Sequence, residues 1–137
     1  MCCRSLDLSF NLLRSLAPFD DDSADSEYAY PELDHLYLIQ NKLAKIEGVA
    51  HRLGLVYLEL GGNRIRTIEN LPISANLKSL FLGKNKITKI EGLAGLTGLR
   101  TLSIQSKLFG GKAGRGMARE AVVADTTVLP FGSQATG

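Results

Sequence analysis

The sequence has few cysteines, few histidines, no tryptophan and no long apolar run. Its two cysteines, Cys2 and Cys3, are adjacent, so they cannot form a disulfide that joins distant parts of the chain. The lack of other cysteines favours a reducing compartment. No stretch approaches the roughly 18 uninterrupted apolar residues of a membrane span, so we expect no membrane association. The start, Met-Cys-Cys-Arg-Ser, has no apolar run and no small-residue cleavage site, so we expect no secretory signal. These absences predict a cytoplasmic and nuclear protein.

Residue types that carry catalysis or bind metals are also scarce. His35 and His51 are the only histidines, and neither lies at metal-ligand spacing from a cysteine. The glycine-rich run at 110–114 does not have the spacing of a phosphate-binding loop, and no strand–loop–helix context surrounds it. The sequence therefore predicts no catalytic residue, no metal and no cofactor, and hence a protein that is not an enzyme.

The sequence does contain an internal repeat between residues 33 and 106, with a period of 22 positions from Leu33 to Leu55. Each unit opens on leucine and continues with apolar residues at its fourth and sixth positions and an asparagine at its ninth. In the unit 55–76 these residues are Leu55, Leu58, Leu60 and Asn63. The pattern L-x-x-L-x-L-x-x-N-x-[IL] is the signature of leucine-rich repeats, whose period is roughly 20–29.

The spacing of the leucines predicts a short strand with one apolar face in every unit. One such strand cannot bury its face alone, but stacked copies form a parallel sheet with a shared core, about 4.8 Å per strand. The return segments, such as 90–96, are short enough for one turn. We therefore predict an α/β leucine-rich-repeat solenoid, with a short parallel sheet on the concave face and 3₁₀ or short helical turns on the convex face.

The repeat also predicts the domain organisation. Residues 1–106 form the solenoid, and 107–137 form a Gly/Ala-rich tail without a period, which we expect to be disordered. In the first unit Cys3 takes the place of the opening leucine, and we expect a small buried hydrophobe there rather than an acylated cysteine. The units are 3–32 with an acidic insert at 20–31, 33–54, 55–76, 77–98 and the partial unit 99–106.

The repeat ends after Ser106. Lys107 stands where an asparagine is expected, and lysine has no acceptor with which to continue an asparagine ladder. We therefore expect an open strand edge at 102–104 and an aggregation hazard there. The alternative is that Val122 and Val123, or Val128 and Leu129, fold back over the open end. With both ends poorly protected, we expect a solenoid of marginal stability.

Two sets of polar residues recur at fixed positions. Stacked asparagines carry donors and an acceptor that can satisfy turn amides which water cannot reach. The predicted structural ladder is Asn11, Asn41, Asn63 and Asn85. Side chains between the inward leucines project from the concave face, where acids and aromatics alternate, as in interface hot spots. The predicted partner-binding residues are Asp7, Tyr37, Glu59, Phe81, His35, Tyr57 and Ser103. The alternative is that these residue types occur on an exposed strand by chance and bind no partner.

Charge is unevenly distributed along the chain. Residues 17–34 hold seven acidic groups and no basic one, whereas 35–106 hold ten basic and four acidic groups. Lys42, Arg64 and Lys86 stack directly after the asparagines, and a row of glutamates follows further on. We expect the two rows to neutralise each other at the surface and each ion pair to contribute little to stability. A nucleic-acid partner would require uncompensated cations interleaved with aromatics, so we expect none.

Four strings carry a closer resemblance: LDLSFNLLRSL (6–16), LELGGNRIRTIENL (58–71), LFLGKNKITKIEGL (80–93) and LSIQS (102–106). They resemble the leucine-rich-repeat regulatory subunit of protein phosphatase 1, subunit 7, in unit length and in the I-E-[GN]-[LV] return segment. The resemblance implies a non-enzymatic solenoid that binds the phosphatase catalytic subunit with its concave face. The implied contacts occupy the fifth position of successive units: Asp7, Tyr37 (phenylalanine in the family), Glu59 and Phe81.

We therefore predict a monomeric protein-binding scaffold, like a regulatory subunit, whose partner is the catalytic subunit of protein phosphatase 1. The family has further units on both sides, so we expect this chain to be truncated relative to it. Two alternatives stay open. One is a leucine-rich-repeat adaptor for a cytoskeletal or ciliary partner, and the other is a non-functional fragment that never folds.

Overall fold

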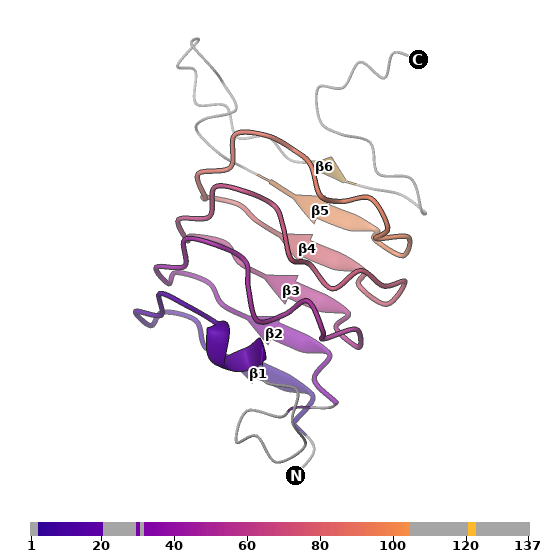
Figure 1. The fold of residues 1–137 in the computed structure, drawn as a ribbon, viewed down its shortest axis with the longest axis horizontal. Helices are drawn as coiled ribbons and strands as arrows, with labels where there is room; N and C mark the ends of the chain where they lie inside the picture. The colour runs from indigo at the N-terminus through magenta and orange to yellow at the C-terminus, as the bar shows by residue number, and fades with distance from the viewer. Residues whose placement is uncertain (1–2, 21–29, 31, 105–120, 123–137) are drawn as a thin grey trace.

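The structure, a computed structural model, describes residues 3–20, 30, 32–104 and 121–122. Its described strands form one sheet in the order β1-β2-β3-β4-β5-β6 (Figure 1). The first five strands are parallel, and each comes from one repeat unit. The elements are β1 (Ser5–Asp7), the 3₁₀ helix η1 (Ala17–Asp20), β2 (His35–Tyr37), β3 (Tyr57–Glu59), β4 (Ser79–Phe81), β5 (Thr101–Ser103) and β6 (Ala121–Val122).

The strand register repeats from unit to unit without a slip. Leu6 pairs with Leu36, Leu36 with Leu58, and the pairing continues to Leu80 and Leu102. In β2 to β5 this central leucine has no exposed surface, and its two neighbours point to the opposite face of the sheet. The predicted solenoid with a short parallel sheet is therefore confirmed. We call the face of the sheet that points away from the core the concave face.

The core is a column of the repeat's apolar positions, stacked from one unit to the next. The eleventh-position residues Leu43, Ile65 and Ile87 are fully buried in this column. In the first unit Leu6, Leu8 and Leu13 are only partly buried, because no further described unit packs on their outer side. They line an apolar hollow of about 300 Å³, whose lining includes Leu6, Leu8, Leu13, Pro18 and Phe19.

The convex side is built from single turns. Leu96 donates its amide to the Leu93 carbonyl, and Leu99 donates to Leu96, each at 3.2 Å. Bonds between residues three apart are of the 3₁₀ type. In the described part of the chain only η1 extends such a turn into a 3₁₀ helix. The return segments are thus shorter than a full helix, as their length predicts.

The return segments share one left-handed residue. Gly48, Asn70 and Gly92 occupy equivalent positions, with φ angles of 75°, 51° and 73°. A Cβ atom added at Gly48 would overlap the Leu16 carbonyl oxygen of the preceding unit, and one at Gly92 would overlap that of Ile68. The I-E-[GN]-[LV] motif therefore has a structural cause: glycine and asparagine tolerate the left-handed backbone, and at positions 48 and 92 glycine also lets adjacent convex turns approach closely.

The edge beyond β5 is not open where an open edge was expected. β6 pairs antiparallel with β5, with Thr101 opposite Val122 and Leu102 opposite Ala121. The expectation of an unpaired edge over 102–104 is therefore wrong at Leu102, because Ala121 and Val122 supply a further strand there. The predicted tail otherwise lies outside the described residues, as does most of the acidic insert.

Candidate functional site

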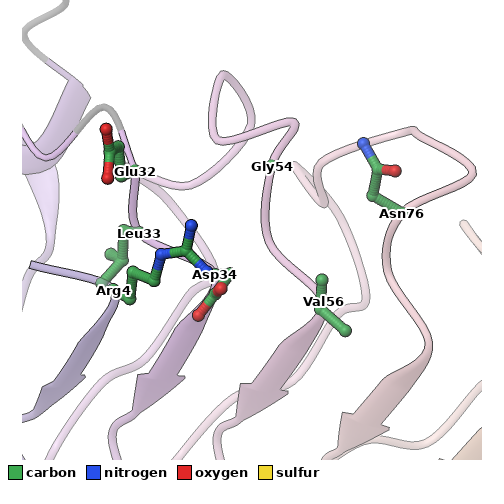
Figure 2. Close-up of a pocket in the computed structure, with 7 residues that line it drawn as sticks. All are labelled: Arg4, Glu32, Leu33, Asp34, Gly54, Val56 and Asn76. Atoms are coloured by element: carbon green, nitrogen blue, oxygen red, sulfur yellow. The ribbon is translucent and has the colours of Figure 1, made fainter.

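A hollow of about 350 Å³ lies beside the amino ends of the strands (Figure 2). Acidic, basic, amide and apolar residues line it together, namely Arg4, Glu32, Leu33, Asp34, Gly54, Val56 and Asn76. The described residues contain no cluster of three histidine, cysteine or carboxylate side chains that could hold a metal ion. They also contain no helix that is long and apolar enough to cross a membrane. This hollow offers no recognisable chemistry, so the concave face is the stronger candidate.

The concave face brings the predicted partner-binding residues into two adjacent rows. Strand pairing places Asp7 beside Tyr37, Tyr37 beside Glu59, and Glu59 beside Phe81. The second row contains Ser5, His35, Tyr57, Ser79 and Thr101 in the same register. Adjacent strands lie about 4.8 Å apart, so side chains in one row are direct neighbours. The repeat therefore assembles one continuous surface from separate units.

Four rings on this face form the aromatic cluster, which consists of His35, Tyr37, Tyr57 and Phe81. Tyr57 lies at its centre, with ring centroids 5.1 Å from Tyr37, 5.3 Å from Phe81 and 5.7 Å from His35. Each ring is half-buried, so part of every ring remains in contact with solvent. Ring pairs at such distances attract one another beyond their burial, by about 0.5–1.5 kcal/mol each. The cluster is therefore a preorganised apolar patch.

A carboxylate is fixed inside this patch. The Tyr57 hydroxyl donates a hydrogen bond to Glu59 Oε2 at 2.9 Å. Burial, the hydrogen bond to Glu59 and the negative charge of Glu59 together raise the pKa of Tyr57 to about 12. Glu59 is thereby held in one orientation between Tyr37 and Phe81.

The raised pKa of Tyr57 predicts a late step in the tyrosine titration. The ordinary tyrosine pKa is 10.0, and the value in the fold is about 12. The stabilisation from the protonated hydroxyl is therefore complete below pH 10.0 and is lost as the pH rises through about 12. We expect Tyr57→Phe to abolish the latest step in tyrosinate absorbance, and Glu59→Gln to shift that step to lower pH. A late step that survives in Tyr57→Phe would contradict the assignment.

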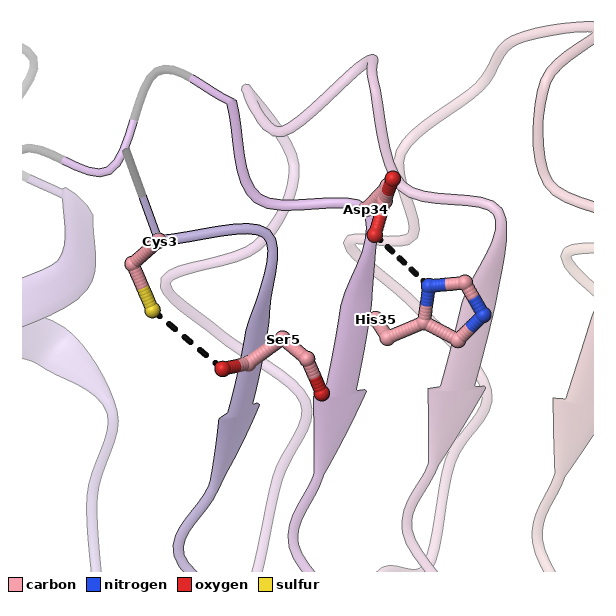
Figure 3. Close-up of polar contacts among 4 residues, drawn as sticks. All are labelled: Cys3, Ser5, Asp34 and His35. Atoms are coloured by element: carbon pink, nitrogen blue, oxygen red, sulfur yellow. Dashed lines mark hydrogen bonds and ion pairs between the residues drawn. The ribbon is translucent and has the colours of Figure 1, made fainter.

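Two polar contacts anchor the amino-terminal end of the face. His35 Nδ1 lies 2.6 Å from Asp34 Oδ1 (Figure 3). The Asp7 carboxylate accepts a hydrogen bond from the Ser9 amide at 2.9 Å, and its side-chain and backbone hydrogen bonds with Ser9 lower the pKa of Asp7. Asp7 is therefore negatively charged at neutral pH. The sequence analysis missed Asp34, because a residue just before a strand has no fixed place in the row pattern.

Two predicted residues contribute less than expected. Ser103 has only 8% of its surface exposed, so it offers little contact area to a partner, and we remove it from the binding row. Cys3 is half-buried against the core, and its Sγ donates to the Ser5 carbonyl at 3.2 Å (Figure 3). Cys2 lies outside the described residues.

Below the strands, the buried asparagines bond consecutive units to one another. Asn63 Nδ2 donates to the Leu38 carbonyl of the preceding unit and to the Leu60 carbonyl of its own, both at 2.9 Å. Its Oδ1 accepts from the Leu43 amide at 3.1 Å. Asn41 and Asn85 make the same set of bonds one unit away in each direction.

Asn11 differs from the other asparagines. It is exposed, and its side chain donates to two carbonyls of its own unit, those of Leu8 and Ser9. The asparagines thus hold the strands, and the aromatic cluster above them, in a fixed register.

Comparison with known proteins supports the repeat assignment. A family model described as "Leucine Rich repeats (2 copies)" matches residues 75–109. An internalin (inlF) from Listeria monocytogenes is similar in structure, with a TM-score of 0.58 and 26% identity over 92% of this chain. An internalin C2 (inlC2) from the same organism matches 74% of this chain at 24% identity, with a TM-score of 0.45.

The chain spans only part of the proteins that it resembles. It covers 35% of the length of the internalin and 51% of the length of internalin C2. No curated protein matched the sequence. The fold is thus that of a leucine-rich-repeat solenoid, and proteins built from such repeats typically act as protein-binding scaffolds.

Proposed function

We propose that this chain is a protein-binding scaffold that docks the catalytic subunit of protein phosphatase 1 on its concave face. The observation that supports docking on this face is the aromatic cluster with Glu59 fixed within it. Half-exposed aromatic rings that adjoin one another on a sheet are unfavourable in water unless a partner covers them. The choice of the phosphatase as partner is supported by the resemblance of residues 58–71 and 80–93.

The geometry of the face favours tight docking over loose contact. Parallel pairing between strands fixes the backbone under every ring, and the Tyr57 hydrogen bond fixes Glu59. Side chains that are already ordered lose little conformational entropy when a partner binds. Tyrosine and phenylalanine surrounded by less critical residues are also the typical composition of hot spots. Phe81 and Glu59 are therefore the two residues whose loss we expect to weaken binding most.

The test is binding of the purified catalytic subunit of protein phosphatase 1 to the full chain by titration calorimetry. We expect the double variant Glu59→Ala and Phe81→Ala to weaken binding about 100-fold, which corresponds to about 2.8 kcal/mol. This is less than twice the cost of about 2 kcal/mol for one hot-spot residue, because the effects of neighbouring hot-spot residues are not additive. The matched control is Glu69→Ala with Ile73→Ala, which removes one carboxylate and one exposed apolar side chain away from the concave face. We expect the control pair to bind within about threefold of the wild type.

The two double variants together decide the proposal. If Glu59→Ala with Phe81→Ala binds as well as the wild type, the concave face is not the docking surface. If the wild type does not bind the phosphatase at all, the phosphatase is the wrong partner. Circular dichroism of each variant shows that a loss of binding does not come from a loss of fold.

A further inference from the structure

A second surface, away from the concave face, is strongly basic. It lies just beyond the carboxyl ends of the strands, where the chain leaves the sheet. Its residues come immediately before or shortly after the asparagine of each unit in sequence. We call this surface the basic edge and define it by six side chains: Arg14, Lys42, Arg64, Arg66, Lys84 and Lys86. All are exposed except Lys42, which is half-buried. The equivalent positions of the same units include no acidic residue.

The backbone stacks three of these cations, Lys42, Arg64 and Lys86, in register. The Lys42 amide donates to the Leu13 carbonyl, the Arg64 amide to Leu43 and the Lys86 amide to Ile65, each at 2.8 Å. Consecutive units are therefore bonded to each other at this level as well as within the sheet. The steps between stacked residues are close to the spacing of paired strands, about 4.8 Å.

The positions between the cations point inward. Leu43, Ile65 and Ile87 follow the stacked cations directly and are fully buried in the core. Their burial leaves the neighbouring side chains, such as those of Arg64 and Arg66, on the outside. The buried apolar residues thus hold the backbone of the basic edge in place, and its cations lie at fixed positions on the surface.

The glutamates further along the units do not compensate this array. In the described part of the chain, no ion pair or hydrogen bond involves a side chain of the six cations. Lys89, which lies outside the basic edge, pairs with Glu91 at 3.3 Å. Glu47 instead accepts hydrogen bonds from the Ser15 hydroxyl and, at 3.3 Å, from the Leu16 amide. The expected charge compensation is therefore not made by ion pairs at these six cations within the described residues, and Glu47 and Glu91 bond to other groups.

We propose that the basic edge docks an extended acidic segment of a protein partner. Like charges stacked a few ångströms apart repel one another, and an anionic segment laid across them relieves that repulsion. The carboxylates of an extended chain that point to one side recur about every 6.6 Å, which long lysine and arginine side chains can reach from a ladder of about 4.8 Å. Arginine also binds carboxylates with two parallel hydrogen bonds.

The composition of the basic edge favours a peptide over a nucleic acid. Single-stranded nucleic acids are bound by cations together with aromatic side chains on which the bases stack. The positions beside the cations in the units 33–54, 55–76 and 77–98 are Gln40, Ala44, Gly62 and Thr88, and none of these is aromatic. The first unit has a single exposed ring at these positions, Phe10, so no series of rings alternates with the cations. The aromatic cluster lies on the concave face instead. The acidic segment therefore needs only charge and an extended backbone.

The test measures fluorescence anisotropy of a labelled decamer of glutamate, with a decamer of glutamine and a decamer of deoxythymidine as comparison probes. We expect the full chain to bind the glutamate decamer and not the glutamine decamer, and to lose affinity about tenfold or more as salt rises from about 0.05 to 0.3 M. We expect Arg64→Gln with Lys86→Gln to weaken binding about tenfold. The matched control, Arg4→Gln with Arg100→Gln, removes the same charge from the other ends of the strands and should change binding less than about threefold.

Three outcomes would overturn the proposal: no binding of the glutamate decamer at low salt, an equal loss in both double variants, or tighter binding of the thymidine decamer that depends on Arg64 and Lys86. The first outcome removes the site. The second shows a diffuse effect of net charge, and the third reassigns the surface to nucleic acid. Glu59→Ala with Phe81→Ala leaves the basic edge intact and should bind the glutamate decamer like the wild type, so this proposal and the phosphatase proposal can fail independently.

Discussion

Replacing Asn63 with aspartate should lower the free energy of unfolding at neutral pH by about 4 kcal/mol, the order of magnitude for a buried charge without a partner. The substitution keeps the shape of the side chain and the oxygen that accepts from the Leu43 amide. It replaces the amide nitrogen, however, with an oxygen that faces the Leu38 and Leu60 carbonyl oxygens at 2.9 Å. The residue is 6% exposed, so water cannot screen this repulsion.

The stability of Asn63→Asp should depend on pH, because the introduced carboxyl is destabilising only when it is charged. Burial beside two carbonyls raises the pKa of the introduced carboxyl above its value in the unfolded chain. The destabilisation is then complete above the folded-state pKa and shrinks as the pH falls toward the unfolded-state pKa. Urea unfolding followed by circular dichroism at neutral and at acidic pH measures both effects. The stability gap between variant and wild type should narrow in acid.

Asn11→Asp is the matched control for this experiment. Asn11 occupies the equivalent position of the first unit, but it is exposed and bonds only carbonyls of its own unit. Water can solvate a carboxylate there, so we expect a change of less than about 1 kcal/mol. If Asn63→Asp were as stable as Asn11→Asp, the buried asparagines would not be what couples one unit to the next.

The sequence predicts the strands and their pairing because each repeated leucine determines two things. A leucine such as Leu58 specifies an inward position in its own strand, and its recurrence at Leu80 specifies which residue of the next strand lies beside it. Buried positions are strongly constrained in this way, since a slip of one residue would turn the leucines outward. The strands, their order and their register therefore follow from the spacing alone.

Side-chain contacts between rows are less predictable. The pattern places Tyr57 and Glu59 in different rows, and only the rotamers decide that the Tyr57 hydroxyl reaches Glu59. The same limit applies to Asp34 with His35, and to Glu47, whose carboxylate turns to Ser15. Pairing between β5 and β6 joins segments without any shared period, so the repeat contains no signal for it. Periodicity thus predicts which face a residue occupies but not which neighbour it contacts.

Replacing Gly48 with alanine should lower the free energy of unfolding by about 3 kcal/mol. A residue with a Cβ atom in the left-handed region costs about 1–2 kcal/mol relative to glycine, and Gly48 has a φ of 75°. The new methyl group would also overlap the Leu16 carbonyl and lie 3.0 Å from Phe19 Cβ, so the two convex turns must move apart. Moving them opens the core around Leu16 and Phe19, which are both buried.

Two further variants separate the backbone and steric strain at Gly48 from the effect that any glycine-to-alanine substitution has on the unfolded chain. Gly54 has an ordinary φ, and a Cβ there would lie 3.8 Å from the nearest atom, so Gly54→Ala should be neutral or slightly stabilising in urea unfolding. Asn70 keeps a side chain at the position equivalent to Gly48, and its Nδ2 donates to the Ile46 carbonyl at 3.0 Å. Asn70→Gly removes that hydrogen bond and relieves the strain of the left-handed backbone, and these effects oppose each other within about 1 kcal/mol. An equal loss in Gly48→Ala and Gly54→Ala would contradict the view that close approach of the convex turns, rather than chain entropy, requires glycine at position 48.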